Sequence, residues 1–435
     1  MQTLIEKIKT KTACLGVIGL GYIGLPLAVE KAKAGFKTIG FDIQQKKVNL
    51  LNKGQNYIGD VVSEELESVI KNGMFRATLD FSLVASCDSV CICVPTPLDS
   101  HQEPDISYVK QAAESLVPYM HKHMLVVLES TTYPGTTEEL VKPILEKSGL
   151  VCGKDFYLAF SPERVDPGNS VFKIKNTPKI VGGCTPESTD VAAVMYQMVL
   201  DAPVHKVSSP AVAEMEKILE NIYRNINIGL VNELAMLCDK MNISIWEVID
   251  AAKTKPYGFQ AFYPGPGLGG HCIPLDPYYL SWKAREFGFH TSMIEASMMI
   301  NDKMPEYCVD RIGRILNKFK KAMNGSKVLV LGVAYKQDID DCRESPSIKL
   351  IRELIKVGAE VSFYDPNINF FNDKNLSMTG LKELTPDAIE NSDIVVIATA
   401  HSNVDYKFVQ CHAKAIFDTK NVMKNISPRD NIEVL

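Results

Sequence analysis

The sequence lacks an apolar run of the roughly 18–20 residues needed to span a bilayer, so we expect no membrane-spanning helix. The segment Met1–Lys11 carries lysines without an apolar core or a small-residue cleavage site, so we expect no signal peptide. The formal net charge is only −5 with 23% charged residues, which gives no general attraction to nucleic acid or to an anionic membrane. Internal repeats and low-complexity segments are also lacking.

The sequence also lacks paired Cys-x-x-Cys spacing, although it contains 11 cysteines. An odd, scattered set of cysteines favours neither a disulfide framework nor a zinc site. Several cysteines lie in apolar runs, such as Cys91 and Cys93 within Ser89–Val94. We therefore expect reduced thiols, no bound metal and a cytoplasmic location.

A chain of 435 residues is too long for one hydrophobic core, so we expect several domains. Strand and helix patterns alternate in the first half, long helical patterns follow, and the alternation then returns. This order predicts two Rossmann-like doubly wound α/β domains joined by a central all-helical domain with a long helix. The expected boundaries are residues 1–208, 209–322 and 323–435.

Residues 13–42 are typical of one βαβ unit. A short apolar strand at Ala13–Ile18 leads into Gly19-Leu20-Gly21-Tyr22-Ile23-Gly24, which we call the glycine turn, and a helical pattern follows. A second strand, Lys37–Phe41, ends at Asp42. In this context the glycines suit a dinucleotide pyrophosphate at a helix N-terminus, and the acid suits the ribose diol of NAD. Lys46 could instead accommodate a 2′-phosphate, or it could be an ordinary surface lysine.

Polar side chains follow the next predicted strands, Ser89–Val94, Met124–Glu129 and Phe156–Phe160. Ligands of doubly wound sheets bind beyond the carboxyl ends of the strands, so the following residues are site candidates. Turn formation, helix capping and surface ion pairs are the alternative roles. The candidates are Pro95, Thr96, Ser130, Thr131 and, in the proline-punctuated loop Ser161–Gly168, Glu163 and Arg164.

The middle of the chain combines a long helix with a glycine-rich loop. On the helix, predicted from Ala211 to about Lys240, Lys217 and Asn221 are four residues apart and share one face. The loop Gly265–Asp276, which we call the cysteine loop, has four glycines within six residues and then Cys272. A thiol presented by such a loop is a candidate nucleophile, although a buried, inert cysteine is an equally simple interpretation.

The last third begins with a predicted strand at Lys327–Gly332, and a polar loop follows it up to Pro346. This unit has no glycine turn, so its pattern indicates a dinucleotide-type sheet without the dinucleotide motif. In the loop, Lys336 and Arg343 suit phosphate or carboxylate binding. The nearby acidic residues Asp338, Asp340 and Asp341 could equally explain these two cations by charge balance.

Three co-linear blocks of this sequence resemble the UDP-glucose/GDP-mannose dehydrogenase family over essentially the full length. The blocks are the glycine turn with VPTP and EST, the Lys-x-x-x-Asn helix with GPGLGGHCIPLDP, and GxAYKxDxDDxRESP near the C-terminus. Within the family, Tyr263–Tyr279 and residues 282–286 look most like the UDP-N-acetylglucosamine 6-dehydrogenase branch.

The resemblance implies a four-electron oxidation of a sugar C6 alcohol to a carboxylate with two NAD⁺. It implies that Lys217 and Asn221 assist the first oxidation and that Cys272 traps the aldehyde as a thiohemiacetal, which becomes a thioester. Water then hydrolyses the thioester. Asp276, Glu163 and Thr131 match the groups that position or deprotonate this water. We assign no role to His271.

The resemblance also implies two sets of binding residues and at least a homodimer through the long helix. The expected NAD ligands are Gly19, Gly21, Tyr22, Ile23, Gly24, Asp42, Lys46, Pro95, Thr96, Thr131 and Arg343. The expected UDP-sugar ligands are Glu163, Arg164, Lys217, Asn221, Tyr263, Gly265, Gly267, Gly269 and Lys336.

The sequence favours UDP-N-acetylglucosamine, with UDP-N-acetylmannosamine or UDP-glucose as alternatives. Two departures from the pattern of glucose-specific members disfavour glucose. Those members often carry a second glutamate where this sequence has Asp166-Pro167. They also often carry an arginine shortly before the cysteine loop, where the nearest polar residues of this sequence are Lys253, Lys255 and Gln260. A two-electron hydroxyacid or 6-phosphogluconate-type dehydrogenase, which has no use for Cys272, and a catalytically inactive nucleotide-sugar binder are the other possible functions.

Overall fold

The computed structural model describes residues 2–59, 61–166, 168–169, 171–270 and 272–435. Two compact units make up the chain. Unit 1 comprises Met1–Glu220 and Tyr278–Phe289, and unit 2 comprises Asn221–Pro277 and His290–Leu435. The expected residues Pro167 and His271 lie outside the described residues.

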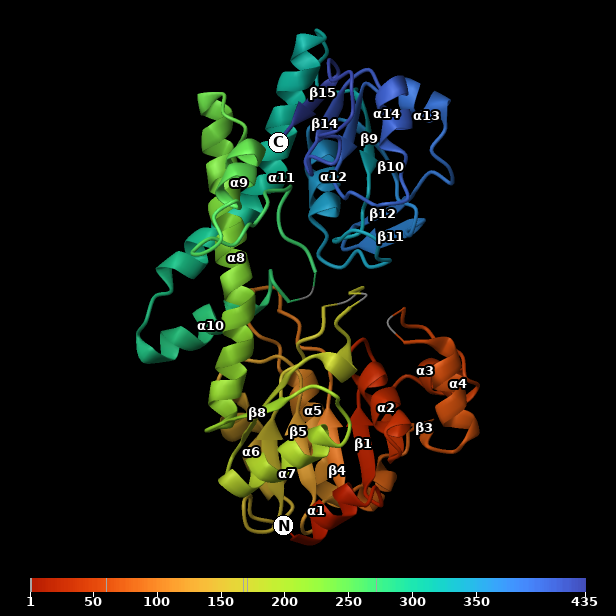
Figure 1. Cartoon of the computed structure of the whole chain (residues 1–435), viewed down its shortest axis with the longest axis vertical. Coiled ribbons are helices and arrows are strands. Elements are labelled where there is room, and N and C mark those ends of the chain that lie inside the picture. Colours follow the sequence, from red (N-terminus) through yellow and green to blue (C-terminus); the bar gives the residue numbers. More distant parts are fainter. Residues whose placement is uncertain (1, 60, 167, 170, 271) are drawn as a thin grey trace. The chain divides into compact units, whose positions relative to one another are not determined.

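Unit 1 is built on an eight-stranded sheet with the strand order β3-β2-β1-β4-β5-β6-β7-β8 (Figure 1). All neighbouring strands are parallel except β6 and β7, which pair antiparallel. From β1 the strands are added first on one side, as β2 and β3, and then on the other, beginning with β4, and doubly wound folds bind their ligands at this switch point between β1 and β4. The strands are β1 (Cys14–Ile18), β2 (Lys37–Phe41), β3 (Phe75–Thr78), β4 (Ser89–Ile92), β5 (Leu125–Leu128), β6 (Tyr157–Phe160), β7 (Lys179–Gly183) and β8 (Val204–Val207).

Helices cover both faces of this sheet, and a separate hydrophobic cluster fills each side. Because successive side chains of a strand point to opposite faces, Val17 joins one cluster and Ile18 the other. Buried strands of this kind explain the continuous apolar runs in the sequence. The helices are α1 (Gln2–Lys9), α2 (Gly24–Lys33), α3 (Gln45–Asn52), α4 (Ser63–Lys71), η1 (Phe81–Ser86), α5 (Ser107–Leu116), η2 (Val117–Tyr119), the π-helical η3 (Thr137–Val141), α6 (Lys142–Glu146), η4 (Ile174–Asn176), α7 (Pro186–Gln197) and η5 (Arg285–Phe287).

Unit 2 contains a five-stranded parallel sheet with the order β10-β9-β13-β14-β15, a β11-β12 hairpin and long helices (Figure 1). Its strands are β9 (Lys327–Leu331), β10 (Glu360–Tyr364), β11 (Phe370–Asp373), β12 (Leu376–Thr379), β13 (Ile394–Ile397), β14 (Ile416–Asp418) and β15 (Ile432–Val434). Its helices are α9 (Ile245–Ala252), α11 (Ser292–Lys318), α12 (Pro346–Lys356), α13 (Pro386–Glu390) and α14 (Tyr406–His412).

The chain passes between the units at three points: within α8 (Pro210–Met241), the long green helix of Figure 1, within α10 (Asp276–Ala284), and between Phe289 and His290. Within unit 2, buried polar contacts join α8 to α11. Asn232 donates to Asn301 at 2.9 Å, and the Ser297 hydroxyl donates to Asn225 at 2.7 Å. In the part of the chain that the structure describes, no helix is both long enough and apolar enough to traverse a bilayer.

The expected fold class is confirmed: unit 1 carries a doubly wound, mostly parallel sheet, unit 2 carries a parallel sheet, and the middle of the sequence is helical. Four strands were not predicted, namely β3, β11, β12 and β15. They have only three or four residues and alternate or expose their side chains, so no apolar run marks them in the sequence. The three domains, with boundaries after residues 208 and 322, stay a prediction.

Candidate active site

The glycine turn follows β1 and leads into α2 at the switch point of the unit 1 sheet. Gly19 has φ +88°, and a Cβ there would lie 2.5 Å from the Cys93 carbonyl oxygen. A Cβ on Gly24 would lie 1.8 Å from the Gly19 carbonyl oxygen, so only glycine allows helix and turn to pack this closely. A Cβ on Gly21 would meet nothing within 4 Å, which leaves this backbone open to a ligand. Of the other two candidates in the turn, Tyr22 is exposed and Ile23 is half-buried.

Asp42 directly follows β2 beside this turn and is buried. Its carboxylate accepts hydrogen bonds from the Leu20 N–H at 3.0 Å and the Gln44 N–H at 2.9 Å. Lys47, which the sequence analysis missed, places its ammonium 3.7 Å from the carboxylate, whereas Lys46 is exposed on α3. The cation nearest to Asp42 is therefore one position further along the helix than expected.

The loops after β4 and β5 are tied to each other at the same sheet edge. The Thr96 hydroxyl donates to the Thr131 carbonyl at 2.8 Å, and the Ser130 hydroxyl donates to the Val94 carbonyl at 2.8 Å. The Tyr279 hydroxyl, on α10, also donates to the Thr96 carbonyl. Thr96 and Thr131 thus lie together as expected, while Pro95 is exposed.

Glu163 follows β6 and is buried against a lysine that the sequence analysis did not single out. One of its oxygens accepts the backbone N–H groups of Arg164 and Val165, and the other lies 3.2 Å from the Lys179 ammonium. Burial acts to raise the pKa of Glu163, but Lys179, the two N–H groups and Lys217 outweigh it and lower that pKa. Glu163 is therefore ionised at neutral pH.

Arg164 extends from the same loop toward the first turns of α8. Its guanidinium pairs with Glu220 at 2.5 Å and donates to the Pro178 carbonyl at 2.9 Å. Burial is the main cause that raises the pKa of neighbouring Glu216 to about 7. Arg164 thus fastens its loop to the helix, and its expected contact with a sugar stays a prediction.

Lys217 lies on the same helix and is 7% exposed. Among the residues that the structure describes, no hydrogen bond or ion pair engages its ammonium. An enclosed cation of this kind can stabilise an oxygen on which negative charge develops.

In unit 2, Asn221 and Asp276 are both buried, and the Asn221 amide donates to the Asp276 carboxylate at 2.5 Å. The Asp276 backbone N–H in turn donates to the Cys272 carbonyl at 2.9 Å. Asn225, one turn after Asn221 on α8, holds the Ile273 carbonyl at 3.1 Å. The helix thereby fixes the turn that carries Cys272, whose side chain is half-buried.

The glycines of the cysteine loop let it approach the polar loop that follows β9. A Cβ on Gly269 would lie 2.6 Å from Pro346 and 2.7 Å from Tyr335, so a larger residue would displace the loop. Gly267 has φ +123°, and a Cβ on Gly265 would lie 2.7 Å from the Lys420 ammonium. The second and third sequence blocks therefore meet inside unit 2.

Three other candidates of unit 2 have identifiable surroundings. Arg343 is exposed, and its guanidinium makes a bidentate pair with Asp341. Tyr263 is 47% exposed and stacks on Trp246 with ring centroids 5.9 Å apart. Lys336 is half-buried. Arg343 is thus paired with a neighbouring acidic residue, as the charge-balance alternative expects. Its contact with a cofactor stays a prediction.

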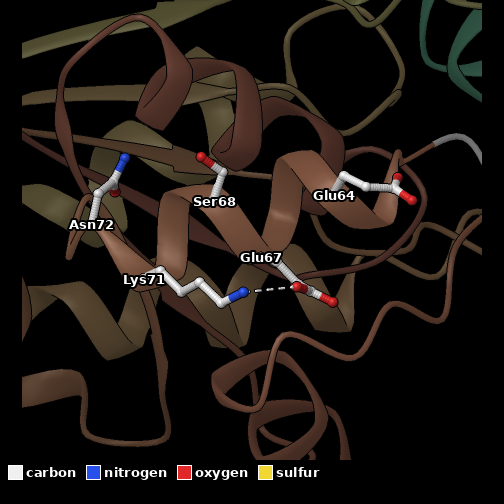
Figure 2. A pocket seen from close by; sticks show the side chains of 5 residues that line it. All are labelled: Glu64, Glu67, Ser68, Lys71 and Asn72. Carbon is white, nitrogen blue, oxygen red and sulfur yellow. Dashed lines mark hydrogen bonds and ion pairs between the residues drawn. The ribbon is translucent and has the colours of Figure 1, made fainter.

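A pocket on the surface of unit 1 is lined by Glu64, Glu67, Ser68, Lys71 and Asn72, on and beside α4 (Figure 2). Lys71 and Glu67 pair with each other at 3.1 Å. None of these side chains is a site candidate, and all five are exposed, so we assign the pocket no role.

Comparisons with known proteins match nearly the whole length of this chain. Residues 13–200, 211–303 and 329–425 match the NAD binding domain, the central domain and the UDP binding domain of the UDP-glucose/GDP-mannose dehydrogenase family. Protein CapL of Staphylococcus aureus is 38% identical over 95% of this chain and 98% of its own length. The UDP-N-acetyl-D-glucosamine 6-dehydrogenase of Pseudomonas aeruginosa is 36% identical over 89% of this chain and 90% of its own length. The solved UDP-D-ManNAc dehydrogenase of Pyrococcus horikoshii superposes with a TM-score of 0.88 at 31% identity, covering 97% of this chain and 98% of that one.

Proposed function

This chain belongs to the UDP-glucose/GDP-mannose dehydrogenase family, and we propose that it oxidises the C6 alcohol of UDP-N-acetylglucosamine to the carboxylate. Membership makes it an NAD-dependent UDP-sugar 6-dehydrogenase, and the choice of sugar is the proposed part. In the balanced reaction, one alcohol, one water and two NAD⁺ give one carboxylate, two NADH and three protons. The observation that carries the proposal is the bond from Asn221 to Asp276 beside the turn that bears Cys272.

NAD is the cofactor, and the glycine turn fits it because Gly21 opens onto free space and the N-terminus of α2 follows. When bound, NAD⁺ accepts a hydride. We assign the pyrophosphate to Gly19, Gly21 and Gly24, and the adenosine ribose to Asp42. Thr96 and Thr131, at the carboxyl ends of β4 and β5, would lie along the nicotinamide half.

Lys217 and Asn221 would stabilise the substrate oxygen during the first oxidation. The C6 hydroxyl must lose its proton as the hydride leaves, so negative charge develops on that oxygen. The ammonium of Lys217 and the amide of Asn221 are buried, and buried donors act strongly because little water screens them.

Cys272 would then form a bond from its sulfur to the aldehyde carbon, giving a thiohemiacetal. Loss of a second hydride converts this adduct to a thioester, and water displaces the thiolate to give the carboxylate. Asp276, Glu163 and Thr131 are the residues that we assign to positioning or deprotonating this water.

UDP-N-acetylglucosamine is preferred over UDP-N-acetylmannosamine and UDP-glucose because relatives that act on it match most of the chain and because of the resemblance around Tyr263–Tyr279. Relatives named UDP-N-acetyl-D-mannosamine dehydrogenase match the chain at 33–35% identity over 94–97% of its length, which is as close a match as the 34–36% identity over 89% of the two glucosamine relatives. UDP-N-acetylmannosamine is therefore the second candidate substrate.

We also assign the face of α8 that bears exposed apolar residues to a second copy of the chain. The spacing of three, four or seven residues keeps these side chains on one stripe of the helix. Each is 37–59% exposed, and burying such a stripe favours association. The stripe, here called the α8 stripe, consists of Val212, Met215, Leu219, Tyr223, Leu230, Leu234, Leu237 and Met241. The cytoplasmic location stays a prediction.

The test is the amount of NADH formed per UDP-sugar consumed, measured in parallel on the three sugars. A ratio near two on UDP-N-acetylglucosamine, with slower turnover of the others, is the expected result. Faster turnover of UDP-N-acetylmannosamine would reassign the substrate. A ratio near one would exclude the thioester route and favour two-electron chemistry, and no NADH at all would leave a nucleotide-sugar binder.

A further inference from the structure

Three charged side chains meet inside unit 1 at the sheet edge that bears the candidate site. The Lys179 ammonium lies 2.7 Å from Glu129 and 3.2 Å from Glu163. Glu129 is 0% exposed, Lys179 4% and Glu163 8%. Charged groups are almost never buried to this degree unless they are paired, so this cluster requires an explanation.

The antiparallel pairing of β6 and β7 brings Lys179 to this edge. Phe160 lies opposite Gly182 in the ladder, and continuing the register by three residues places Glu163 opposite Lys179. The Ser161 hydroxyl, which donates to the Ile180 carbonyl at 2.7 Å, extends the contact in the same register. In a wholly parallel sheet, the first residue of a strand would lie at the opposite edge, away from the site.

Lys179 also binds a second buried carboxylate, that of Glu129. Glu129 accepts Lys179 on one oxygen and the Tyr196 hydroxyl on the other, at 2.5 Å. Tyr196 and Glu129 are fully buried, so neither has water available as an alternative partner. Because both oxygens of Glu129 are engaged, the Lys179 ammonium has one fixed position. The Glu163 carboxylate must therefore orient one oxygen toward that position to bind it.

We propose that Lys179 is a positioning residue of the dehydrogenase, which holds the Glu163 carboxylate ionised and fixed in direction for its work on substrate or water. The inference rests on the proposed function, since Lys179 acts through Glu163. Two N–H groups of its own loop bind the first oxygen of Glu163, and Lys179 binds the second. An ionised carboxylate held in this way accepts hydrogen bonds through its remaining lone pairs and orients the donor.

The test uses Lys179→Met and the double variant Lys179→Met/Glu129→Gln. The double variant removes one charge of each sign, so it does not leave the Glu129 carboxylate buried without its cation, which could prevent folding. Without the ammonium, the pKa of Glu163 rises, so the acid limb of the kcat/KM profile should move to higher pH by about one unit or more. Lys179→Arg should restore most of the wild-type profile. Lys206→Met is the matched control, because Lys206 lies on β8, 49% exposed, and pairs only with Asp190 among the described residues.

Glu163→Gln separates this inference from the proposed function. We expect it to slow turnover and to make Lys179→Met nearly silent when the two are combined, because the lysine acts through that carboxylate. Two results would refute the positioning role and leave the proposed function standing. In the first, Glu163→Gln is slow but Lys179→Met and Lys179→Met/Glu129→Gln keep the wild-type acid limb. In the second, the effect of Lys179→Met multiplies with that of Glu163→Gln. If Glu163→Gln is fully active, the assigned role of Glu163 falls and the inference falls with it.

Discussion

The Asn221 amide donates a 2.5 Å hydrogen bond to the Asp276 carboxylate, although the residues lie far apart in the chain. Asn221 belongs to α8, and Asp276 is the first residue of α10. Because the Asp276 N–H also binds the Cys272 carbonyl, the bond connects the long helix to the turn that carries the candidate nucleophile. Both side chains are buried, so the bond satisfies polar atoms that little water can reach.

Asn221→Ala should lower kcat by about 10- to 1,000-fold, because the developing oxyanion loses a donor and Asp276 loses the hydrogen bond from this amide. Asn227→Ala is the matched control on the same helix, since Asn227 donates only to the Tyr223 carbonyl among the described residues. Its kcat should stay within about twofold of wild type. Steady-state kinetics checks both, and equal activity of the two variants would remove Asn221 from the mechanism.

Cys272→Ser should lower NADH production by at least about a thousandfold, because a hydroxyl is far less nucleophilic than a thiolate at neutral pH. Any residual turnover should stop after the first oxidation, and hydroxylamine should then trap an aldehyde. Cys411→Ser, at an exposed position of α14, should behave as wild type. Full four-electron turnover by Cys272→Ser would contradict the thioester route.

Asp42→Asn should lower kcat/KM for NAD⁺ by about 10- to 100-fold, because the ribose diol loses a charged acceptor. Lys46→Met should leave the preference for NAD⁺ over NADP⁺ unchanged, since Lys46 is exposed and Lys47 is the lysine beside Asp42. Kinetics with the two cofactors distinguishes these effects. A larger change in preference from Lys46→Met than from Asp42→Asn would assign cofactor choice to Lys46.

Glu214 should make the stability of unit 1 depend on pH. This α8 residue is wholly buried and accepts hydrogen bonds from Gly135 and Thr137 at the start of η3, where no threonine side chain caps the helix. Burial outweighs these bonds and raises the pKa of Glu214 from 4.5 to about 7.

A carboxyl group whose pKa is higher in the folded state gives stability that is fully present below about pH 4.5 and is lost as the pH rises through about 7. The loss corresponds to roughly 3 kcal/mol. Glu214→Gln should therefore remove a fall in melting temperature that wild type and the control Glu64→Gln, at an exposed position of α4, both show between pH 5 and pH 8. Identical pH dependence of all three proteins would mean that Glu214 does not titrate in this range.

Leu230→Glu should dissociate the proposed homodimer, because a charge in the centre of the α8 stripe cannot be buried against a second apolar helix. Lys71→Glu, at a highly exposed position of α4, is the control and should leave the mass unchanged. Light scattering coupled to size-exclusion chromatography gives the mass of each. A monomeric wild-type protein would refute the assembly outright.

The sequence by itself determined the parts of the site that depend on short spacings. A strand, three glycines, a helix and Asp42 make a dinucleotide turn wherever they occur in this order, and four-residue spacing fixes Lys217 relative to Asn221 because a helix has one geometry. Gly265–Asp276 was recognisable for the same reason, since glycine density limits what backbone can form there.

Only the tertiary structure decided which distant residues support these parts. Lys179 lies opposite Glu163 because β7 runs antiparallel to β6, and no local pattern records strand direction. Glu129 and Tyr196 in the interior, and Glu214 at the start of η3, carry no signal as single residues, because their roles come from burial against partners far away in the chain. Strand register and burial are properties of the whole packed unit, so they first become visible when the chain is folded.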